Sequence, residues 1–570
     1  MQRKLGELTG REFDLVIVGG GICGAAAAWD ATQRGLSVAL LERGDFGGET
    51  SANSLKVVHG GIRYLQHLDL ARVRESSRER TALLRIAPHL VHPLPVLVPT
   101  YGHGLRGAEA LGAAFALLNG LTADRNRGLT DPDRQIPRAR LVSGSRVRAW
   151  HPELDAPGMT GAGLFWDGQL YNPSRLVWEF VRTAGRAGAV AANYCDVGGF
   201  LRRGTRVVGV AVCDRFGGER FEVRSRMVLN AAGPFAGQLG ARSGARAAGG
   251  IPLSRDMAVV IRRRLVHERA LAVQTKYQDP DAYLSRGRRH LFVVPWRDVT
   301  LVGVNSIVYR GDPNCLTVTE SEVEGFLDEI NDAEPRFALT MDDVALVHAG
   351  LLPIGADALV GANVSFGKRS HVVDNARADG VDGLITAVCN RYTTARRVGE
   401  RAVDLAIQKL GVAARPSRSA ETPLHGGRVA TFAGLVQEIA RASGADRLRP
   451  DVAEQLAHNH GSAYGEVLQV VHETPSYGVR IGTSGTLAAE VIHAIRNEMA
   501  QTLADCVFRR TDLGTAGHPG DDALAACAAL MAEELGWSAA RTELELGEVR
   551  TRYPGPQGPG RLGVQITPCG

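Results

Sequence analysis

The chain has 570 residues, 44% of them hydrophobic and 22% charged, the balance of an ordinary globular protein with room for two or three packed units. Its formal net charge of +5 is too small for this length to indicate nucleic-acid binding, and no apolar run is long enough to span a bilayer. The eight cysteines form no Cys-x-x-Cys pair, which argues against a disulfide framework and against a metal site.

The first ten residues hold no apolar stretch of the kind found in a secretory signal, so we expect a cytoplasmic protein. One segment leaves membrane association open. Residues 110–121 are apolar almost all round, with Arg106 before them and Arg125 and Arg127 after them. This segment would form a helix that lies either in a membrane interface or buried in the larger domain. The oligomeric state also stays open, with a homodimer as one option.

The clearest motif lies near the N-terminus, where an apolar strand runs into a glycine-rich turn. Residues 15–18, Leu-Val-Ile-Val, predict a strand buried on both faces, and a helix follows the turn. Gly19 permits the tight turn, Gly21 lets backbone approach a pyrophosphate, and Gly24 lets the helix pack on the strand. A second apolar strand ends at Glu42, whose carboxylate can accept ribose hydroxyls. The unit predicts a dinucleotide site at the helix N-terminus.

The rest of the chain divides into regions of different character. Short alternating runs predict an antiparallel sheet over about 250–345, the natural place for a substrate domain. The nucleotide-binding domain is expected around it, from discontinuous segments at about 12–90, 150–250 and 345–415. Together these segments make one unit over 12–415. A helical domain follows over 420–550, with one helix expected over 487–509, and the Pro/Gly-rich residues 551–570 read as a loose tail.

Several motifs beyond the glycine turn match the sequence pattern of one protein family. They include residues 50–65 with the block His59-Gly-Gly-Ile-Arg-Tyr64, then Asp167-Gly-Gln169 and Asn230-Ala-Ala-Gly-Pro234. In these motifs, and over nearly its whole length, the chain resembles the FAD-dependent glycerol-3-phosphate dehydrogenases and oxidases. The resemblance implies an α/β fold: a Rossmann-like FAD-binding domain, an antiparallel-sheet substrate domain and a C-terminal helical cap.

The resemblance also implies a cofactor and a reaction. FAD would be the cofactor, and the enzyme would oxidise a carbinol C–H by hydride transfer to flavin N5. The electrons would then pass to quinone or oxygen. The implied cofactor-binding residues are Gly19, Gly21, Gly24, Glu42, Thr50, Ser51, Ser54, His59, Gly60, Gly233, Thr393 and Thr394. The last two suit the first turn of a helix whose positive end would face the flavin.

Four residues are candidates for the substrate side of the site. His59 is the first choice for catalytic or flavin-positioning work, with a satisfied core histidine as the alternative. Arg63 follows a Gly-Gly turn, and its fork suits the oxygens of a phosphate or carboxylate. Arg369 matches the second anion-binding arginine of the family. Arg391 keeps a positive charge beside the flavin, so we expect an anionic small-molecule substrate.

The departures from the family pattern fall at the substrate and the flavin ring. Gly-Gly-Lys-x-Thr-Thr appears as Cys389-Asn-Arg-Tyr-Thr-Thr394, and Gly-x-Arg-Pro appears as Gly350-Leu-Leu-Pro353, so Leu352 replaces an arginine. Gly-Thr-Thr-Asp reads Gly303-Val-Asn-Ser306, with Asn305 at its third position, and Met257 stands where a histidine is common. Losing one arginine from a phosphate site costs about 1.5–3 kcal/mol.

Three interpretations follow from these departures. The substrate is glycerol 3-phosphate held in a different way, or it is another molecule such as an amine, a hydroxy acid or an intermediate of specialised metabolism. In the third interpretation the chain binds flavin without catalysis and serves as a partner or scaffold.

Overall fold

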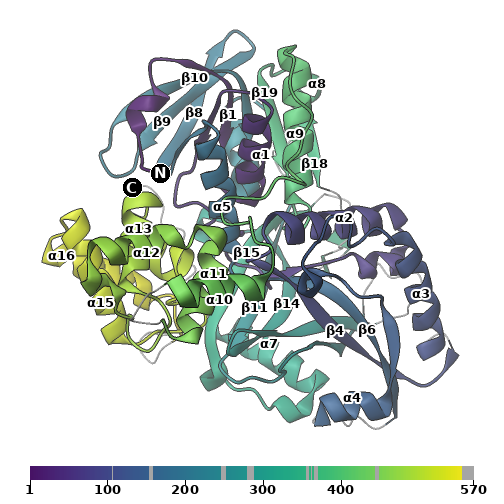
Figure 1. The fold of residues 1–570 in the computed structure, drawn as a ribbon. Coiled ribbons are helices and arrows are strands. Elements are labelled where there is room, and N and C mark those ends of the chain that lie inside the picture. The colour runs from purple at the N-terminus through teal and green to yellow at the C-terminus, as the bar shows by residue number, and fades with distance from the viewer. Residues whose placement is uncertain are drawn as a thin grey trace.

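The computed structural model describes residues 1–570 except 105–106, 153–157, 246–251, 279–287, 355–358, 361–362, 365–369, 443–447 and 555–570. Two predictions fall in these gaps. Arg369, and the expected loose tail from residue 555 onward, lie outside the described residues. Figure 1 shows a parallel-sheet domain above, a second sheet below it and a helical domain beside the second sheet.

The first sheet is built around β1 (Glu12–Val18), whose central residues Leu15, Val16 and Ile17 have no exposed surface. Burial on both faces is what an apolar strand without alternation favours. Parallel partners lie on both sides of β1: β10 (Arg220–Asn230) and β19 (Leu384–Val388) on one, β2 (Val38–Leu41) and β7 (Val190–Ala192) on the other. The antiparallel strands β18 (His371–Asp374), β9 (Arg206–Asp214) and β8 (Cys195–Arg203) complete it.

Three helices cover one face of this sheet: α1 (Ile22–Gln33), α5 (Pro173–Arg186) and α9 (Ala395–Leu410). The run Ala25–Ala28 in α1 is fully buried, because small side chains allow its neighbours to approach closely. A Cβ at Gly399 would lie 2.9 Å from the backbone nitrogen of Ala27, so α9 packs against α1 almost backbone to backbone. The sequence predicts Thr393 and Thr394 in the first turn of this helix. This prediction is wrong, because α9 begins at Ala395 and both threonines precede it.

The second sheet is larger than the predicted segment 250–345. Its strand order is β15 (Val344–Pro353), β11 (Leu253–Ile261), β14 (Val299–Tyr309), β13 (Arg288–Trp296), β12 (Ala270–Gln278), β4 (Val91–Tyr101), β6 (Met159–Leu170) and β3 (Val57–Val58), with β5 (Arg140–Ser143) on β6. Every pairing is antiparallel except that of β12 with β4. A separate two-stranded ribbon joins β16 (Leu359–Val360) and β17 (Asn363–Val364).

The boundaries predicted from the sequence are therefore wrong at three strands. Residues 57–58, 159–170 and 345–353 are predicted for the nucleotide-binding domain, but β3 pairs with β6, β6 pairs with β4, and β15 pairs with β11. Alternation predicts a strand but not its partner, which depends on contacts far apart in the chain. Helix α7 (Glu320–Ala333) covers the outer face of the second sheet, and its N-terminus carries a capping box of Thr319 and Glu322.

The remaining helices lie at the edges of the two sheets or form the C-terminal domain. Those of the first group are α2 (Leu70–Ile86), α3 (Ala108–Leu121), α4 (Gly144–Trp150), α6 (Ala236–Ala241) and α8 (Asn375–Asp379). The C-terminal domain contains α10 (Phe432–Ala442), α11 (Pro450–His460), α12 (Gly465–Glu473), α13 (Ala488–Asn497), α14 (Leu503–Asp505), α15 (Asp521–Leu535) and α16 (Ala539–Arg550). The single helix expected over 487–509 is broken between α13 and α14, where Met499 has a φ of +55°.

Buried ion pairs attach the helical domain to the loop after β2. The guanidinium of Arg510 donates two hydrogen bonds of 2.7 Å to the carboxylate of Asp45, and Nε of Arg509 donates a third of 2.6 Å. All three side chains are almost fully buried. Asp45 lies three residues after Glu42, so this contact fixes the end of β2, where the predicted ribose ligand stands.

Helix α3 is more exposed than a core helix. Phe115 and Leu118 are its only buried residues, so the interpretation of this segment as a buried helix is wrong. Figure 1 shows α3 at the outer edge of the second sheet. Within the described part of the chain, no helix combines the length and apolarity needed to cross a bilayer.

Candidate functional site

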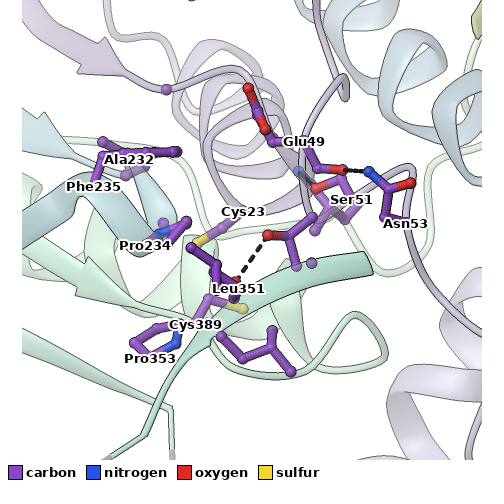
Figure 2. Close-up of a pocket in the computed structure, with 18 of the residues that line it drawn as sticks. Cys23, Glu49, Ser51, Asn53, Ala232, Pro234, Phe235, Leu351, Pro353 and Cys389 are labelled. Carbon is purple, nitrogen blue, oxygen red and sulfur yellow. Dashed lines mark hydrogen bonds between the residues drawn. The ribbon is translucent and has the colours of Figure 1, made fainter. Parts of the chain in front are cut away.

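A cavity of about 560 Å³ lies between the two sheets (Figure 2). This volume falls within the range of about 300–1,000 Å³ that is usual for ligand pockets. Its walls come from the segments that follow β1, β2, β10 and β19 in the first sheet, and from β11, β14 and β15 in the second. Ligands of open α/β sheets bind beyond the carboxyl ends of the parallel strands, which is where this cavity opens.

The glycine turn has the geometry that its spacing predicts. Gly19 has a φ of +108°, and a Cβ there would lie 2.5 Å from the carbonyl oxygen of Ala231. At Gly24 a Cβ would lie 1.9 Å from the carbonyl oxygen of Gly19, so this glycine permits the contact between helix and strand. At Gly21 the nearest atom is Oγ of Ser51 at 3.2 Å. Gly21 lines the cavity, so its backbone is open to a ligand.

Two side chains fix the polar edge of this turn. Oε2 of Glu42 accepts a hydrogen bond of 2.6 Å from the N–H of Gly20, and Oε1 accepts one of 2.8 Å from Gly44. Burial raises the pKa of the Glu42 carboxyl, although these two bonds oppose the shift. Oγ of Ser51 accepts from the N–H of Ile22 at 3.0 Å, at the start of α1. Both side chains line the cavity.

Some of the other predicted cofactor-binding residues line the cavity, and the rest lie behind its wall. Thr50, Ser54 and Gly233 line the cavity, and Oγ1 of Thr50 donates to the carbonyl oxygen of Leu351 at 2.8 Å (dashed in Figure 2). Four others are not among the cavity-lining residues of the described chain: Gly24, Gly60, Thr393 and Thr394. Oγ1 of Thr393 accepts from the N–H of His59 at 3.1 Å, so it holds the wall from behind.

His59 points into the cavity and is held by a buried carboxylate. Its side chain is 47% exposed, whereas that of Asp167 is 2% exposed. Nδ1 of His59 lies 2.9 Å from Oδ2 of Asp167, and Oδ1 of Asp167 accepts from the N–H of Gly60 at 2.7 Å. A guanidinium nitrogen of Arg80 lies 3.7 Å from the same Oδ1 and balances its charge. The sequence drew attention to Asp167-Gly-Gln169 as a motif, but assigned no role to Asp167.

One of the predicted anion-binding arginines reaches the cavity. Arg391 lines it, with one guanidinium nitrogen 3.1 Å from the hydroxyl of Tyr64 and another 3.9 Å from Oε2 of Glu75. Arg63 lies on the short helix η2 (Ile62–His67), is half-buried and is not among the lining residues. Arg369 lies outside the described residues.

A carboxylate that the sequence did not single out stands at the substrate side of the cavity. Asp256 on β11 lies opposite Gly350 on β15 and opposite Ser306 on β14. Leu352, two residues after Gly350 on β15, lies opposite Ser254 on β11. Residues two apart share one face of a strand, so Asp256 and Leu352 face the same side, and both line the cavity. Oδ1 of Asp256 has no hydrogen-bond partner among the described residues.

This position carries a negative charge above about pH 6. Burial raises the pKa of Asp256 to about 6, and the hydroxyls of Ser254 and Ser306 oppose that shift. Met257, placed by sequence reasoning where the family has a histidine, contributes to the wall but packs into the core cluster with Val259. Asn305 pairs with it on β14, and Val304 is the lining residue of that strand.

Comparisons with known proteins identify the same family over nearly the whole chain. Residues 14–403 match the family model described as FAD dependent oxidoreductase, and residues 417–542 match the C-terminal domain of alpha-glycerophosphate oxidase. A glycerol-3-phosphate dehydrogenase of Synechocystis sp. is 30% identical over 94% of this chain and 95% of its own length. The mitochondrial glycerol-3-phosphate dehydrogenase of Mus musculus is 31% identical over 95% of this chain and 73% of its own.

A solved structure extends the agreement to the fold. The glycerol-3-phosphate dehydrogenase from Bacillus halodurans, complexed with FAD, superimposes with a TM-score of 0.75 at 25% identity and covers 96% of this chain and 95% of its own. The fold and the nucleotide-binding turn thus define an FAD-dependent oxidoreductase. Within that class, the chain belongs to the glycerol-3-phosphate dehydrogenase family, as its motifs predict.

Proposed function

We propose that this enzyme oxidises a C–H bond beside a hydroxyl group of a small substrate, with His59 as the base that takes the hydroxyl proton. The observation that carries the proposal is the contact between Nδ1 of His59 and Oδ2 of Asp167, 2.9 Å long, with the histidine ring open to the cavity. An ionised Asp167 favours a proton on Nδ1, which leaves Nε2 free to accept one. This is the arrangement of an oriented general base.

The residues of the cavity fit FAD. Gly21 leaves open backbone at the N-terminus of α1, where a pyrophosphate would be favoured by unpaired N–H groups. Glu42 lines the cavity and keeps lone pairs free for ribose hydroxyls beyond its two backbone contacts. FAD supplies the hydride acceptor of the reaction. The remaining tasks, positioning the substrate, excluding water and removing a proton, fall to the chain's own residues.

Two substrate classes follow from the charges at the substrate side. Arg391 supports an anionic alcohol such as glycerol 3-phosphate, and its contacts with Tyr64 and Glu75 hold the guanidinium in place. A second candidate function is oxidation of a cationic amine or amino alcohol. Asp256 favours it, because this carboxylate has no cationic partner among the described residues and lines the cavity beside Leu352, where the family pattern has an arginine. A bound ammonium group would satisfy that carboxylate.

Steady-state turnover with an artificial dye acceptor tests both classes. The panel contains glycerol 3-phosphate, other phosphorylated polyols, hydroxy acids, and amines or amino alcohols. Turnover with an alcohol supports the first proposal. If an amine is the substrate, its KM should rise below about pH 6, where Asp256 becomes protonated. No turnover with any of them, from protein that holds FAD, would instead support a flavin-binding protein without catalysis.

The electron acceptor is proposed to be quinone or oxygen, as the family resemblance implies. Parallel assays with a soluble quinone and with an oxygen electrode distinguish the two. Oxygen consumption at the rate of substrate oxidation would identify an oxidase, and quinone-dependent turnover without oxygen uptake would identify a dehydrogenase.

We also propose that the face of α3 contacts a membrane surface. Exposed leucines lie on α3 and on the elements packed around it: Leu117 is 45% exposed, Leu68 60%, Leu70 39% and Leu141 41%. Interfacial helices bury such apolar faces at the level of the lipid headgroups. Flotation with anionic vesicles should carry the wild-type protein and lose the Leu117→Ser variant. A stable homodimer in light scattering that Leu117→Ser dissociates would assign this face to a second copy instead.

A further inference from the structure

Two thiols meet in the wall of the cavity. Cys23 lies in the first turn of α1 and Cys389 follows the end of β19, and both residues line the cavity. Sγ of Cys389 donates a hydrogen bond of 3.5 Å to the carbonyl oxygen of Arg391. Figure 2 shows the two sulfur atoms in the same part of the wall. Both cysteines are free, and Cys23 is 7% exposed while Cys389 is half-buried.

The pair of cysteines departs from the sequence pattern of the family that this chain resembles. Position 389 is the first glycine of the Gly-Gly-Lys pattern in the resembling family, and a glycine could not pair with Cys23. None of the steps assigned above to His59, Asp167 or Arg391 uses either sulfur. The two thiols therefore need a separate explanation.

We propose that Cys23 and Cys389 form a thiol modification site, in which hydrogen peroxide converts the pair into an intramolecular disulfide. The sulfur of Cys389 attacks the O–O bond, becomes a sulfenic acid and releases one molecule of water. The sulfur of Cys23 then attacks the sulfenic sulfur, the S–S bond forms, and the hydroxyl leaves with the Cys23 proton as a second water. The two thiols lose two electrons and two protons, and the peroxide gains them.

The surroundings of the two sulfurs set the order of attack. The neighbouring Cys23 thiol lowers the pKa of the Cys389 thiol, with help from the backbone and charge of Arg391, whereas burial opposes this shift. The Cys389 thiol, together with burial, raises the pKa of Cys23 well above its ordinary value. Because Cys389 is more exposed than Cys23 and follows β19 beside Arg391, it is the thiol that reacts first, and Cys23 is the resolving thiol.

The chain offers a matched control in its helical domain. Cys506 and Cys527 also belong to one core cluster, but both have no exposed surface and neither is a cavity-lining residue. A peroxide that enters through the cavity should reach the first pair and leave this second pair reduced. The disulfide would tie the loop after β19 to the glycine turn before α1, two segments of the same wall.

Mass spectrometry of the holoenzyme tests the proposal without an activity readout. The protein is treated with equimolar hydrogen peroxide, alkylated with iodoacetamide under denaturing conditions and digested. We expect a cross-linked peptide containing Cys23 and Cys389, alkylated Cys506 and Cys527, and a loss of two of the seven free thiols of the described residues. In Cys23→Ser the disulfide should be absent, and dimedone should label a sulfenic acid at Cys389.

The variant Cys389→Gly, which restores the family residue, should also form no disulfide, and it keeps the test usable if Cys23→Ser does not fold. Alkylation of both Cys23 and Cys389 after peroxide treatment would overturn the proposal. Oxidation of the Cys506–Cys527 pair at the same rate would overturn it as well, because the cavity would then confer no selectivity.

Discussion

The carboxylate of Asp167 lies 2.9 Å from Nδ1 of His59, and it also accepts the backbone N–H of Gly60 at 2.7 Å. A buried carboxylate with both oxygens engaged fixes the orientation of the ring and the nitrogen that carries its proton. Asp167 is therefore a positioning residue that acts through His59. Asp167 lies on β6, and its partners His59 and Gly60 lie in the turn after β3, the strand that pairs with β6 in the second sheet.

The first prediction concerns this pair. Asp167→Asn should lower kcat about 10²–10⁴-fold while FAD stays bound, because an amide can donate to Nδ1 and so place the proton on Nε2. Asp312→Asn is the control, since Asp312 also lines the cavity but contacts Asn314 and Gln238 instead. Steady-state kinetics with the flavin absorbance recorded in the same samples makes the comparison. Equal kcat in wild type and Asp167→Asn would remove Asp167 from the catalytic account.

The second prediction uses the burial of Asp256. Its folded-state pKa is raised from 3.8 to about 6, so between these values the folded protein binds a proton that the unfolded chain releases. The contribution of this group to stability is present at low pH, falls as pH rises through this window and stays lost above about pH 6. Asp256→Asn should therefore increase the free energy of unfolding near pH 8 by about 2–3 kcal/mol.

Urea unfolding at about pH 5 and pH 8 checks this, with Asp312→Asn as the control on an exposed carboxylate. The increase in the free energy of unfolding caused by Asp256→Asn should be larger at pH 8 than at pH 5. A gain independent of pH, or a loss of stability at pH 8, would mean that the carboxylate has a partner when ionised.

The third prediction concerns substrate charge. Leu352→Arg combined with Asp256→Gly should lower the KM for glycerol 3-phosphate about tenfold or more, because a charge-assisted contact is gained and an opposing charge removed. Leu352→Arg alone should lower this KM by a smaller factor, since the new guanidinium would pair with Asp256 on the same face of the sheet. An unchanged KM in the double variant would place the phosphate elsewhere and would weaken the anionic-substrate proposal.

The fourth prediction tests how the helical domain is held. Asp45→Asn should lower the free energy of unfolding by about 3 kcal/mol, because two buried arginines would share one carboxylate fewer. Asp505 would remain beside Arg509, and Glu498 would remain beside Arg510. Asp404→Asn removes the exposed partner of Arg34 and should cost at most about 1 kcal/mol. Chemical denaturation followed by circular dichroism compares the two. Similar losses in both variants would mean that the buried pairs do not determine docking.

The sequence predicted local features of the site better than its long-range contacts. The glycine turn, Glu42 and the strand at 384–388 could be found because each is defined by neighbouring residues or a short period. The pairing of β6 and β15 with the second sheet could not, because a strand's own residues do not identify its partner. Asp256 escaped notice for the same reason. A single aspartate on a strand becomes informative only when the register places it beside Leu352 and Ser306.

Anaerobic rapid mixing tests the central claim most directly: that this FAD-dependent oxidoreductase removes a substrate proton through His59. Protein with bound FAD is mixed with the substrate found in the turnover panel, and loss of the flavin absorbance band is followed in wild type and in His59→Asn. We predict rapid bleaching in the wild type and bleaching about 10²-fold slower or more in the variant, with the flavin content unchanged. Equal rates in the two proteins would contradict the account, because the proton would then leave by a route that does not include His59.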